Sequence, residues 1–202
     1  STQNIRNVVL LGSTKSGKTT LSEAMLYEGK VIDRRGTVEG KNTVSDNAEI
    51  EQINQRSVYA TPLYAEFMDT KFNIIDTPGA DDFVGGAVSA FKVCDLGVLV
   101  VNAQQGVEVG TQIYARYAKN YHIPLIVAVN QLDGEKASWE TTLESMKEAF
   151  GSKPVVVQYP VTVGPEFDGF IDVLKMKYYR FEGDTGKRQD LEIPANLLEE
   201  AE

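Results

Sequence analysis

Gly12-Ser13-Thr14-Lys15-Ser16-Gly17-Lys18-Thr19 is the stretch that decides the fold of this chain. The apolar run before it, residues 8–11, predicts a short buried strand, and residues 20–26 after it predict a helix. A strand, a glycine-containing loop, Gly-Lys-Thr and a helix form the context that a phosphate-binding loop requires. Backbone N–H groups of such a loop, together with the helix N-terminus, attract phosphate. The stretch therefore predicts a nucleotide site in which Lys18 reaches the β- and γ-phosphates and the Thr19 hydroxyl binds Mg²⁺.

The composition is that of an ordinary globular protein. The chain has 202 residues, of which 42% are hydrophobic and 24% charged, so we expect one sizeable domain with an insertion. A net charge of −9 argues against a general nucleic-acid-binding surface. The single cysteine, Cys94, allows no internal disulfide and fits a reducing, cytoplasmic setting. No stretch has the roughly 20 apolar residues of a membrane span, and the first apolar run is too short for a secretory signal.

Apolar strands alternate with helical patterns along the chain. Strands are predicted at 58–67, 72–76, 96–101 and 124–129, and helices at 85–93, 109–120 and around the apolar stripe Trp139, Leu143, Met146 and Phe150. This order predicts an α/β fold: a P-loop NTPase with a mostly parallel sheet and helices on both faces. Further strands are expected at 154–159 and 169–181, followed by a turn at 183–186 and a helical acidic tail from Pro194, which together suggest a small α+β insertion.

Residues 29–55 have few apolar side chains and no clear period. We expect a long loop without regular structure, in the place where a nucleotide-sensing switch would lie. Plain surface disorder is the alternative interpretation of the same composition.

Two further motifs lie at the ends of predicted strands. Asp76-Thr77-Pro78-Gly79 places a carboxylate where it can assist Mg²⁺ through water, and a glycine whose N–H can approach a phosphate. Asn130-Gln131-Leu132-Asp133 suggests guanine, because the Asp133 carboxylate can accept from the two N–H donors on the guanine edge. Asn130 can brace the neighbouring loop or contact the base. Ligands of open α/β sheets bind at these strand ends, so we expect one nucleotide site.

The candidate nucleotide-binding residues are Gly12, Ser13, Thr14, Lys15, Ser16, Gly17, Lys18, Thr19, Thr20, Asp76, Gly79, Asn130, Gln131 and Asp133. Thr19 and, through water, Asp76 are the candidate metal residues.

The chain resembles the translational GTPases, and among them elongation factor G. The resemblance rests on the three motifs above and on Asp82-Phe83, Gln105 to Glu108, and the segments 154–160 and 169–177. It implies a GTPase core at 1–153 that lacks its last strand and helix, and part of the elongation factor G insertion at 154–202. It also implies binding of GTP, GDP and Mg²⁺ and a role on the ribosome in translocation. Nothing in the sequence suggests an obligate oligomer, so we expect a monomer, and we expect no sequence-specific nucleic-acid binding by this fragment. On this resemblance the chain is a fragment.

The sequence departs from the family at positions that serve hydrolysis. Ala80 stands where the family has the histidine that positions the attacking water, and a methyl group neither orients nor deprotonates water. Tyr59 aligns with the switch threonine that binds Mg²⁺, and Thr61 would replace that threonine only by a register shift. Lys15 replaces an aspartate, and Gln131 replaces the lysine that packs over the base. These changes suggest that nucleotide binding is kept while hydrolysis is weakened.

Several functions remain open on the sequence alone. The first is an elongation-factor-G-like GTPase whose missing histidine is replaced by another group. The others are a non-hydrolysing GTP/GDP switch on the ribosome, a ribosome-protection paralogue, a P-loop kinase using ATP, and an α/β domain with a vestigial P-loop. Asn130 and Asp133 argue against the kinase.

Overall fold

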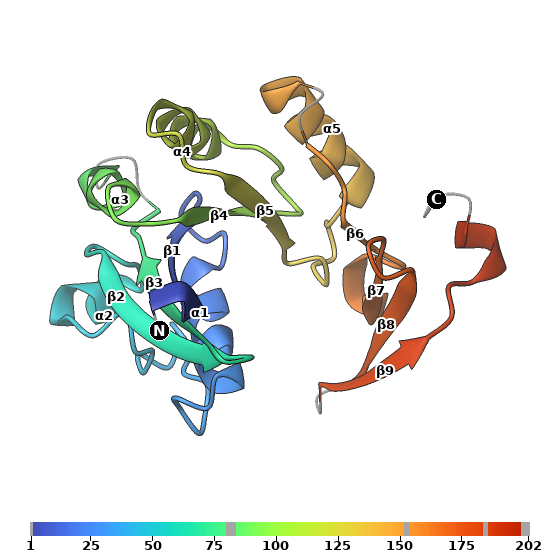
Figure 1. The fold of residues 1–202 in the computed structure, drawn as a ribbon, viewed down its shortest axis with the longest axis horizontal. Helices are drawn as coiled ribbons and strands as arrows, with labels where there is room; N and C mark the ends of the chain where they lie inside the picture. The colour runs from blue at the N-terminus through green and yellow to red at the C-terminus, as the bar shows by residue number, and fades with distance from the viewer. Residues whose placement is uncertain (1, 80–83, 152–153, 184–185, 199–202) are drawn as a thin grey trace. The chain divides into compact units, whose positions relative to one another are not determined.

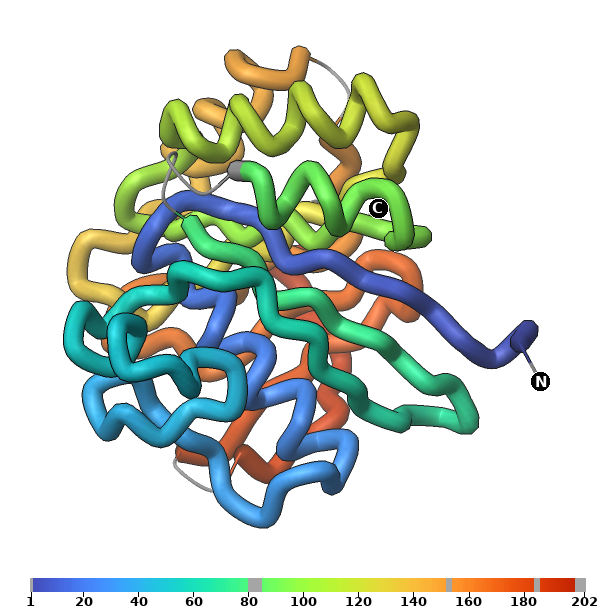
Figure 2. Tube along the Cα trace, turned by 90° about the vertical axis from the view of Figure 1, so that its left-hand side faces the viewer, coloured from blue at the N-terminus to red at the C-terminus, as the bar shows by residue number. Residues whose placement is uncertain are grey.

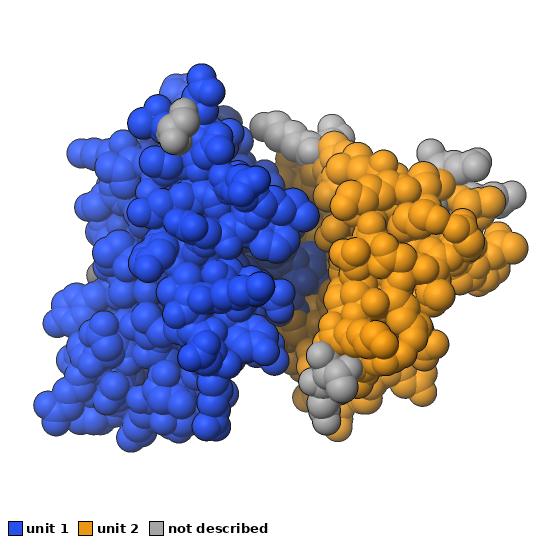
Figure 3. Space-filling model, turned by 60° about the horizontal axis from the view of Figure 1, so that its bottom comes forward, with its two compact units in different colours: residues 1–102, 108–130 blue, residues 103–107, 131–202 orange. Residues whose placement is uncertain are grey.

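The structure is a computed structural model that describes every residue except 1, 80–83, 152–153, 184–185 and 199–202. The chain divides into two compact units (Figure 3). The first contains residues 1–102 and 108–130, and the second contains residues 103–107 and 131–202.

The first unit is built on a five-stranded sheet with the order β2-β3-β1-β4-β5 (Figure 1). Its strands are β1 (Ile5–Leu11), β2 (Thr61–Phe67), β3 (Thr70–Asp76), β4 (Leu96–Asn102) and β5 (Leu125–Asn130). The pairs β1–β3, β1–β4 and β4–β5 are parallel, while β2 and β3 form an antiparallel hairpin. The predicted P-loop fold with a mostly parallel sheet is confirmed.

Helices cover both faces of this sheet. Figure 2 shows α1 (Lys18–Glu28) on one face, and α3 (Val84–Phe91) and α4 (Val109–Asn120) on the other. On the α1 face the partly buried Leu21 and Met25 pack against a buried cluster of Val8, Leu10, Ala65 and Ile74. The apolar positions of the predicted helix therefore form part of the core, and this packing fixes α1 directly after the phosphate-binding loop.

The segment between α1 and β2 is more regular than the sequence suggested. Residues Glu49–Asn54 form a short helix, α2, where the sequence predicted a loop without regular structure. Strand β2 starts at Thr61 and not at residue 58. The physical reason is that the N–H groups of Val58 and Tyr59 both donate to the Glu51 carboxylate at 3.0 Å, so they are not available to a strand ladder.

The second unit contains an antiparallel sheet with the order β6-β7-β8-β9, the helix α5 (Trp139–Phe150) and a short 3₁₀ helix at Gly164–Glu166. The strands are β6 (Gln158–Pro160), β7 (Gly169–Asp172), β8 (Lys177–Glu182) and β9 (Lys187–Leu191). Trp139 of α5 packs against the buried Tyr159, Ile171 and Tyr178. Trp139, the first residue of the stripe predicted for α5, therefore belongs to the core, as expected.

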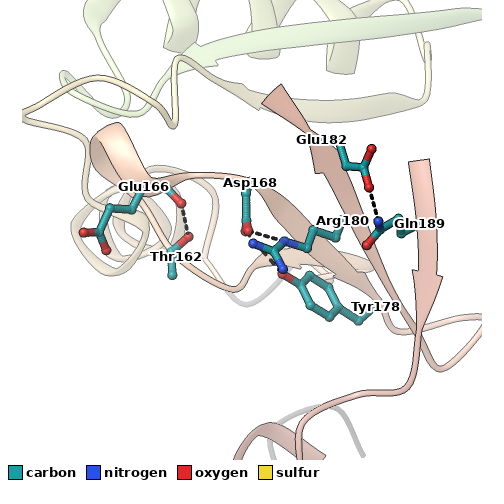
Figure 4. Close-up of polar contacts among 7 residues, drawn as sticks. All are labelled: Thr162, Glu166, Asp168, Tyr178, Arg180, Glu182 and Gln189. Carbon is teal, nitrogen blue, oxygen red and sulfur yellow. Dashed lines mark hydrogen bonds and ion pairs between the residues drawn. The ribbon is translucent and has the colours of Figure 1, made fainter. Parts of the chain in front are cut away.

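Polar contacts link the strands of this second sheet. Asp168 accepts from Arg180 Nε at 2.7 Å and from the Tyr178 hydroxyl at 3.2 Å, and Gln189 donates to Glu182 across the β8–β9 pair (Figure 4). The Thr162 hydroxyl donates to the Glu166 carbonyl oxygen at 2.8 Å.

Several predictions for this unit were wrong in detail. The strand expected at 154–159 is confined to Gln158–Pro160, and the strand expected at 169–181 is two strands joined by a turn. The charged strand β9, Lys187–Leu191, was not predicted, because charged side chains on a sheet edge give no apolar alternation. The tail begins with a 3₁₀ helix at Ala195–Leu197, like the one at Thr2–Asn4 near the other end. Part of the expected turn, residues 184–185, and the end of the tail, 199–202, lie outside the described residues. Among the helices that the structure describes, none is long and apolar enough to cross a membrane.

Candidate nucleotide site

The phosphate-binding loop joins β1 to α1 and has a backbone that requires glycine at two positions. Gly12 has φ 142°, and a Cβ there would collide with the carbonyl oxygen of Val100 on β4. Gly17 has φ 96° and is the N-cap residue of α1. Lys15 also has a positive φ, 63°, although it carries a side chain. The loop thus turns tightly into the helix N-terminus, which is the geometry that the sequence motif predicts.

Lys18 is the buried cation of this loop. Its side chain is almost fully enclosed, and its ammonium group donates to the carbonyl oxygens of Gly12 at 2.9 Å and Ser13 at 3.0 Å. Burial lowers the pKa of Lys18 to about 8, while Asp76 and Asp46 act in the opposite direction. The ammonium therefore lies at the inside of the loop, where a phosphate anion would compensate its loss of water.

Asp76, at the end of β3, accepts hydrogen bonds from two hydroxyl groups on one of its carboxylate oxygens. Thr19 Oγ1 and Ser45 Oγ each donate to Asp76 Oδ2 at 2.9 Å. The other oxygen, Oδ1, is buried and has no hydrogen-bond partner among the described residues. Burial raises the pKa of Asp76 to about 6, against the opposing effect of Lys18. The two candidate metal residues are therefore in direct contact.

Gly79 lies against the phosphate-binding loop. A Cβ at this position would be 2.6 Å from Lys18 Nζ and 2.6 Å from the backbone nitrogen of Thr14. The preceding residues are anchored from both sides: Thr77 Oγ1 donates to the Leu10 carbonyl at 2.6 Å, and the buried Tyr114 hydroxyl donates to the Pro78 carbonyl at 2.8 Å. The next position, Ala80, and its neighbours 81–83 lie outside the described residues.

Asn130 at the end of β5 braces the same loop. Its Nδ2 donates to the Ser16 carbonyl oxygen at 2.9 Å, which is the first of the two roles that the sequence allowed for it. Gln131 and Asp133 belong to the second unit and are described within it. Gln131 has φ 59° and opens a turn that the Gly134 N–H closes at 3.2 Å, and Asp133 is exposed.

Within the first unit, the structure brings together predicted site residues from three separate segments: 12–20, 76–79 and Asn130. Ser13, Ser16, Lys18 and Thr19 are buried beside Asp76 and Gly79, while Thr14, Lys15 and Thr20 are exposed.

Residues 29–60, hereafter the loop segment, are held by the buried carboxylates of Glu23 and Glu51. The sequence did not predict this role for either glutamate. Glu23 on α1 is 1% exposed and accepts from the N–H groups of Gly36 at 2.7 Å and Val44 at 2.6 Å. Glu51 on α2 is also 1% exposed and accepts from Ala48 at 3.1 Å, besides the two N–H groups named above. Both glutamates lie in helices with ordinary sequences, so no local signal marks them.

The loop segment also brings polar side chains to Thr19. Ser57 Oγ and Thr19 Oγ1 share a hydrogen bond of 3.2 Å. Burial raises the pKa of Asp46, against the opposing effect of Ser57. Tyr59, by contrast, is 58% exposed. Thr61 is engaged elsewhere, because its hydroxyl donates to the Ser45 carbonyl at 3.2 Å.

The arrangement combines a buried cation and a loop at a helix N-terminus with a cluster of hydroxyl and carboxylate oxygens. The first part can bind phosphate groups, and the second offers the hard oxygen donors that Mg²⁺ prefers.

Comparison with known proteins agrees with this geometry. Residues 3–194 match the elongation factor Tu GTP binding domain family. A curated relative, the elongation factor G-like protein of Thermotoga maritima, is 35% identical over 189 residues, which are 94% of this chain and 27% of the relative. A crystal structure of a protein from Thermus thermophilus superposes with a TM-score of 0.90 at 32% identity, covering 98% of this chain and 29% of that one. The chain thus spans less than a third of these relatives.

Proposed function

Because the chain belongs to the elongation factor Tu GTP binding domain family, as an elongation factor G-like member of the translational GTPases, we propose that it binds GTP and GDP together with Mg²⁺. We further propose that the protein acts on the ribosome in translocation. The residues from Gly12 to Thr20 hold the phosphates, and Asp76, Gly79, Asn130, Gln131 and Asp133 complete the site. The core at 1–153, the insertion at 154–202 and a monomeric state are parts of this proposal.

One observation carries the proposal: the end of β3 with the residues after it, and the end of β5, both meet the phosphate-binding loop. Asn130 donates to the Ser16 carbonyl, Gly79 approaches Lys18, and Asp76 accepts from Thr19. In a loop whose lysine had no role, we would expect the ammonium group to be exposed, because burying a charge costs free energy. Here the ammonium group is buried close to a buried carboxylate, and the side chain of Asn130 on a distant strand hydrogen-bonds the same loop. Lys18 binds phosphate oxygens as a point charge, and the loop N–H groups orient the phosphate chain.

The donors beside Thr19 fit Mg²⁺. They are hydroxyl and carboxylate oxygens, and Asp76 Oδ1 is a buried acceptor without a partner in the described part of the chain. When bound, Mg²⁺ neutralises charge on the β- and γ-phosphates. Thr19 would contribute its hydroxyl to the ion, and Asp76, which accepts from that hydroxyl, would orient it and assist the ion through water.

Guanine preference is proposed from Asp133, whose carboxylate accepts from two N–H donors that adenine lacks. The experiment is displacement of a fluorescent GDP analogue from the protein by unlabelled GTP, GDP and ATP. We expect GTP and GDP to compete and ATP to fail at about a hundredfold higher concentration. Equal competition by ATP would favour the kinase alternative, and no binding of any nucleotide would favour a vestigial P-loop.

Weak hydrolysis is proposed from Ala80, because removal of a water-positioning group slows a reaction by about 10²–10⁴-fold. The test is ribosome-stimulated GTP turnover of the full-length protein and of its Ala80→His variant. Low turnover that the histidine restores would place the defect at Ala80. Rapid turnover by the parent would overturn the weak-hydrolysis proposal, while a GTP-bound protein that stays inactive in both forms would favour a non-hydrolysing switch or a ribosome-protection role.

A further inference from the structure

Helix α4, on the face of the sheet opposite α1, contacts the candidate nucleotide site through two buried hydroxyl groups (Figure 2). Thr111 Oγ1 lies 3.4 Å from Ser13 Oγ of the phosphate-binding loop, within a shared hydrogen bond. The Tyr114 hydroxyl donates to the Pro78 carbonyl oxygen at 2.8 Å. Thr111 and Tyr114 are at most 1% exposed and, three positions apart, lie on the same side of the helix. One side of α4 therefore contacts both the loop and the segment after β3.

The three residues that follow β3 each contact a different part of the first unit. Thr77 Oγ1 donates to the Leu10 carbonyl oxygen on β1 at 2.6 Å. The carbonyl of Pro78, which is itself buried, accepts from Tyr114 on α4. Gly79 lies against the phosphate-binding loop. The position of this short segment is therefore set jointly by β1, α4 and the loop.

The peptide between Pro78 and Gly79 has one main rotation left to it. Thr77 is held to β1, and the proline ring fixes φ of Pro78 at about −65°. Rotation about ψ of Pro78 turns the whole peptide plane, with the carbonyl of Pro78 and the N–H of Gly79. The bond is trans, so these two groups point in opposite directions. Because Tyr114 holds the carbonyl, it also fixes the direction of the Gly79 N–H.

The Gly79 N–H is placed to distinguish a triphosphate from a diphosphate. In the phosphate-binding loop motif, the loop N–H groups enclose the α- and β-phosphates, and the lysine extends to the γ-phosphate. Gly79 approaches this lysine from outside the loop, since a Cβ on Gly79 would lie 2.6 Å from Lys18 Nζ. The phosphate nearest to such a donor is the γ-phosphate, which GDP lacks.

We propose that Tyr114 is a positioning residue for recognition of the third phosphate: its hydroxyl holds the Pro78–Gly79 peptide in the orientation that presents the Gly79 N–H to the γ-phosphate. Thr111, through Ser13, holds the start of α4 to the phosphate-binding loop. The inference rests on the proposed function, since it concerns the nucleotide of the same site. It assigns part of the preference for GTP over GDP to a buried side chain that touches neither the nucleotide nor Mg²⁺.

The experiment compares affinities and not turnover. Fluorescent GDP and a fluorescent, non-hydrolysable GTP analogue are titrated separately with the protein in Mg²⁺. Tyr114→Phe keeps the buried ring and removes only the hydroxyl. We expect its GDP affinity to stay within about twofold of the parent and its affinity for the GTP analogue to fall about three- to tenfold, as the loss of one hydrogen bond implies.

The matched control is Tyr121→Phe, which removes a hydroxyl at the exposed end of α4 while its ring keeps its stacking on Phe91. Both affinities should equal those of the parent. An equal loss for GDP and the GTP analogue in Tyr114→Phe would indicate a structural hydroxyl and overturn the inference, and so would no loss for either nucleotide.

A second measurement follows the peptide itself. In protein labelled with ¹⁵N-glycine, the Gly79 amide proton should move downfield when the GTP analogue replaces GDP, because the N–H gains a phosphate acceptor. We expect this change to be largely lost in Tyr114→Phe and kept in Tyr121→Phe. The full change in Tyr114→Phe would overturn the inference even if its affinities differ. A parent protein that binds neither nucleotide would instead reject the proposed function, and this inference with it.

Discussion

Glu23 on α1 accepts the backbone N–H of Val44 at 2.6 Å, across 21 residues of chain. Its second oxygen accepts the Gly36 N–H at 2.7 Å, and the whole residue is buried. The helix that follows the phosphate-binding loop therefore holds the loop segment directly, through one carboxylate. A nucleotide that shifts the start of α1 would move the anchor of this segment as well.

The Glu23→Gln variant tests this anchor. An amide presents an N–H₂ group to one of the two backbone donors, so one buried N–H loses its acceptor, at a cost of about 1–3 kcal/mol. We expect a lower midpoint in urea unfolding and faster proteolysis within the loop segment. The matched control is Glu28→Gln, at the exposed end of the same helix, which should unfold like the parent. Equal midpoints for all three proteins would contradict an anchoring role.

Gly79→Ala should weaken nucleotide binding. The added methyl group would lie 2.6 Å from Lys18 Nζ, so either the lysine or the strand end must move. We expect at least a tenfold loss of affinity for GDP and GTP, a cost of about 1.4 kcal/mol or more. In the control Gly85→Ala, the new methyl group meets no atom within 4 Å, and alanine favours its helix, so affinity should be kept and stability should rise slightly. Tight binding by Gly79→Ala would show that this close approach is dispensable.

Asn130→Ala should reduce nucleotide affinity without changing the choice of base. The substitution removes the hydrogen bond to the Ser16 carbonyl, which is worth about 0.5–1.5 kcal/mol, so we expect a loss of about three- to tenfold for GTP and GDP alike. Equilibrium binding of a fluorescent nucleotide measures this loss. Asn120→Ala, at the exposed end of α4, serves as the control. A loss that appears for GTP but not for GDP would indicate a role other than bracing the loop.

Cys94 should react slowly with thiol reagents while the protein is folded. Its side chain is 8% exposed, and burial raises the pKa of the thiol. The stability that the neutral thiol contributes is therefore fully present below the unfolded pKa and is lost as the pH rises through the raised pKa of the folded state. We expect labelling by an aromatic disulfide at about pH 8, near the ordinary thiol pKa, to follow the unfolding curve in urea. Complete labelling of the native protein within seconds would show that the thiol is accessible.

The local patterns of the sequence were sufficient to predict the sheet of the first unit and the glycine-containing loop between β1 and α1. Residues 8–11 and 96–101 are apolar almost throughout, since strands buried on both faces need no polar alternation, and the glycines of the phosphate-binding loop mark backbone angles that other residues avoid. Asp76 was predicted at the site because it ends such a strand, and strand ends of a parallel sheet meet at one edge.

Tertiary structure alone decided which residues of the loop segment reach that edge. Ser57 lies 38 residues from Thr19 in sequence, and Ser45 lies 31 residues from Asp76, so no periodicity relates the partners. Alignment by resemblance pointed to Tyr59, yet Glu51 holds the Val58 and Tyr59 N–H groups outside the strand, and Ser57 is the residue that faces Thr19. Which backbone N–H groups a buried carboxylate accepts from is determined only in the folded chain, because each long-range hydrogen bond depends on the packing of the elements that carry its two partners.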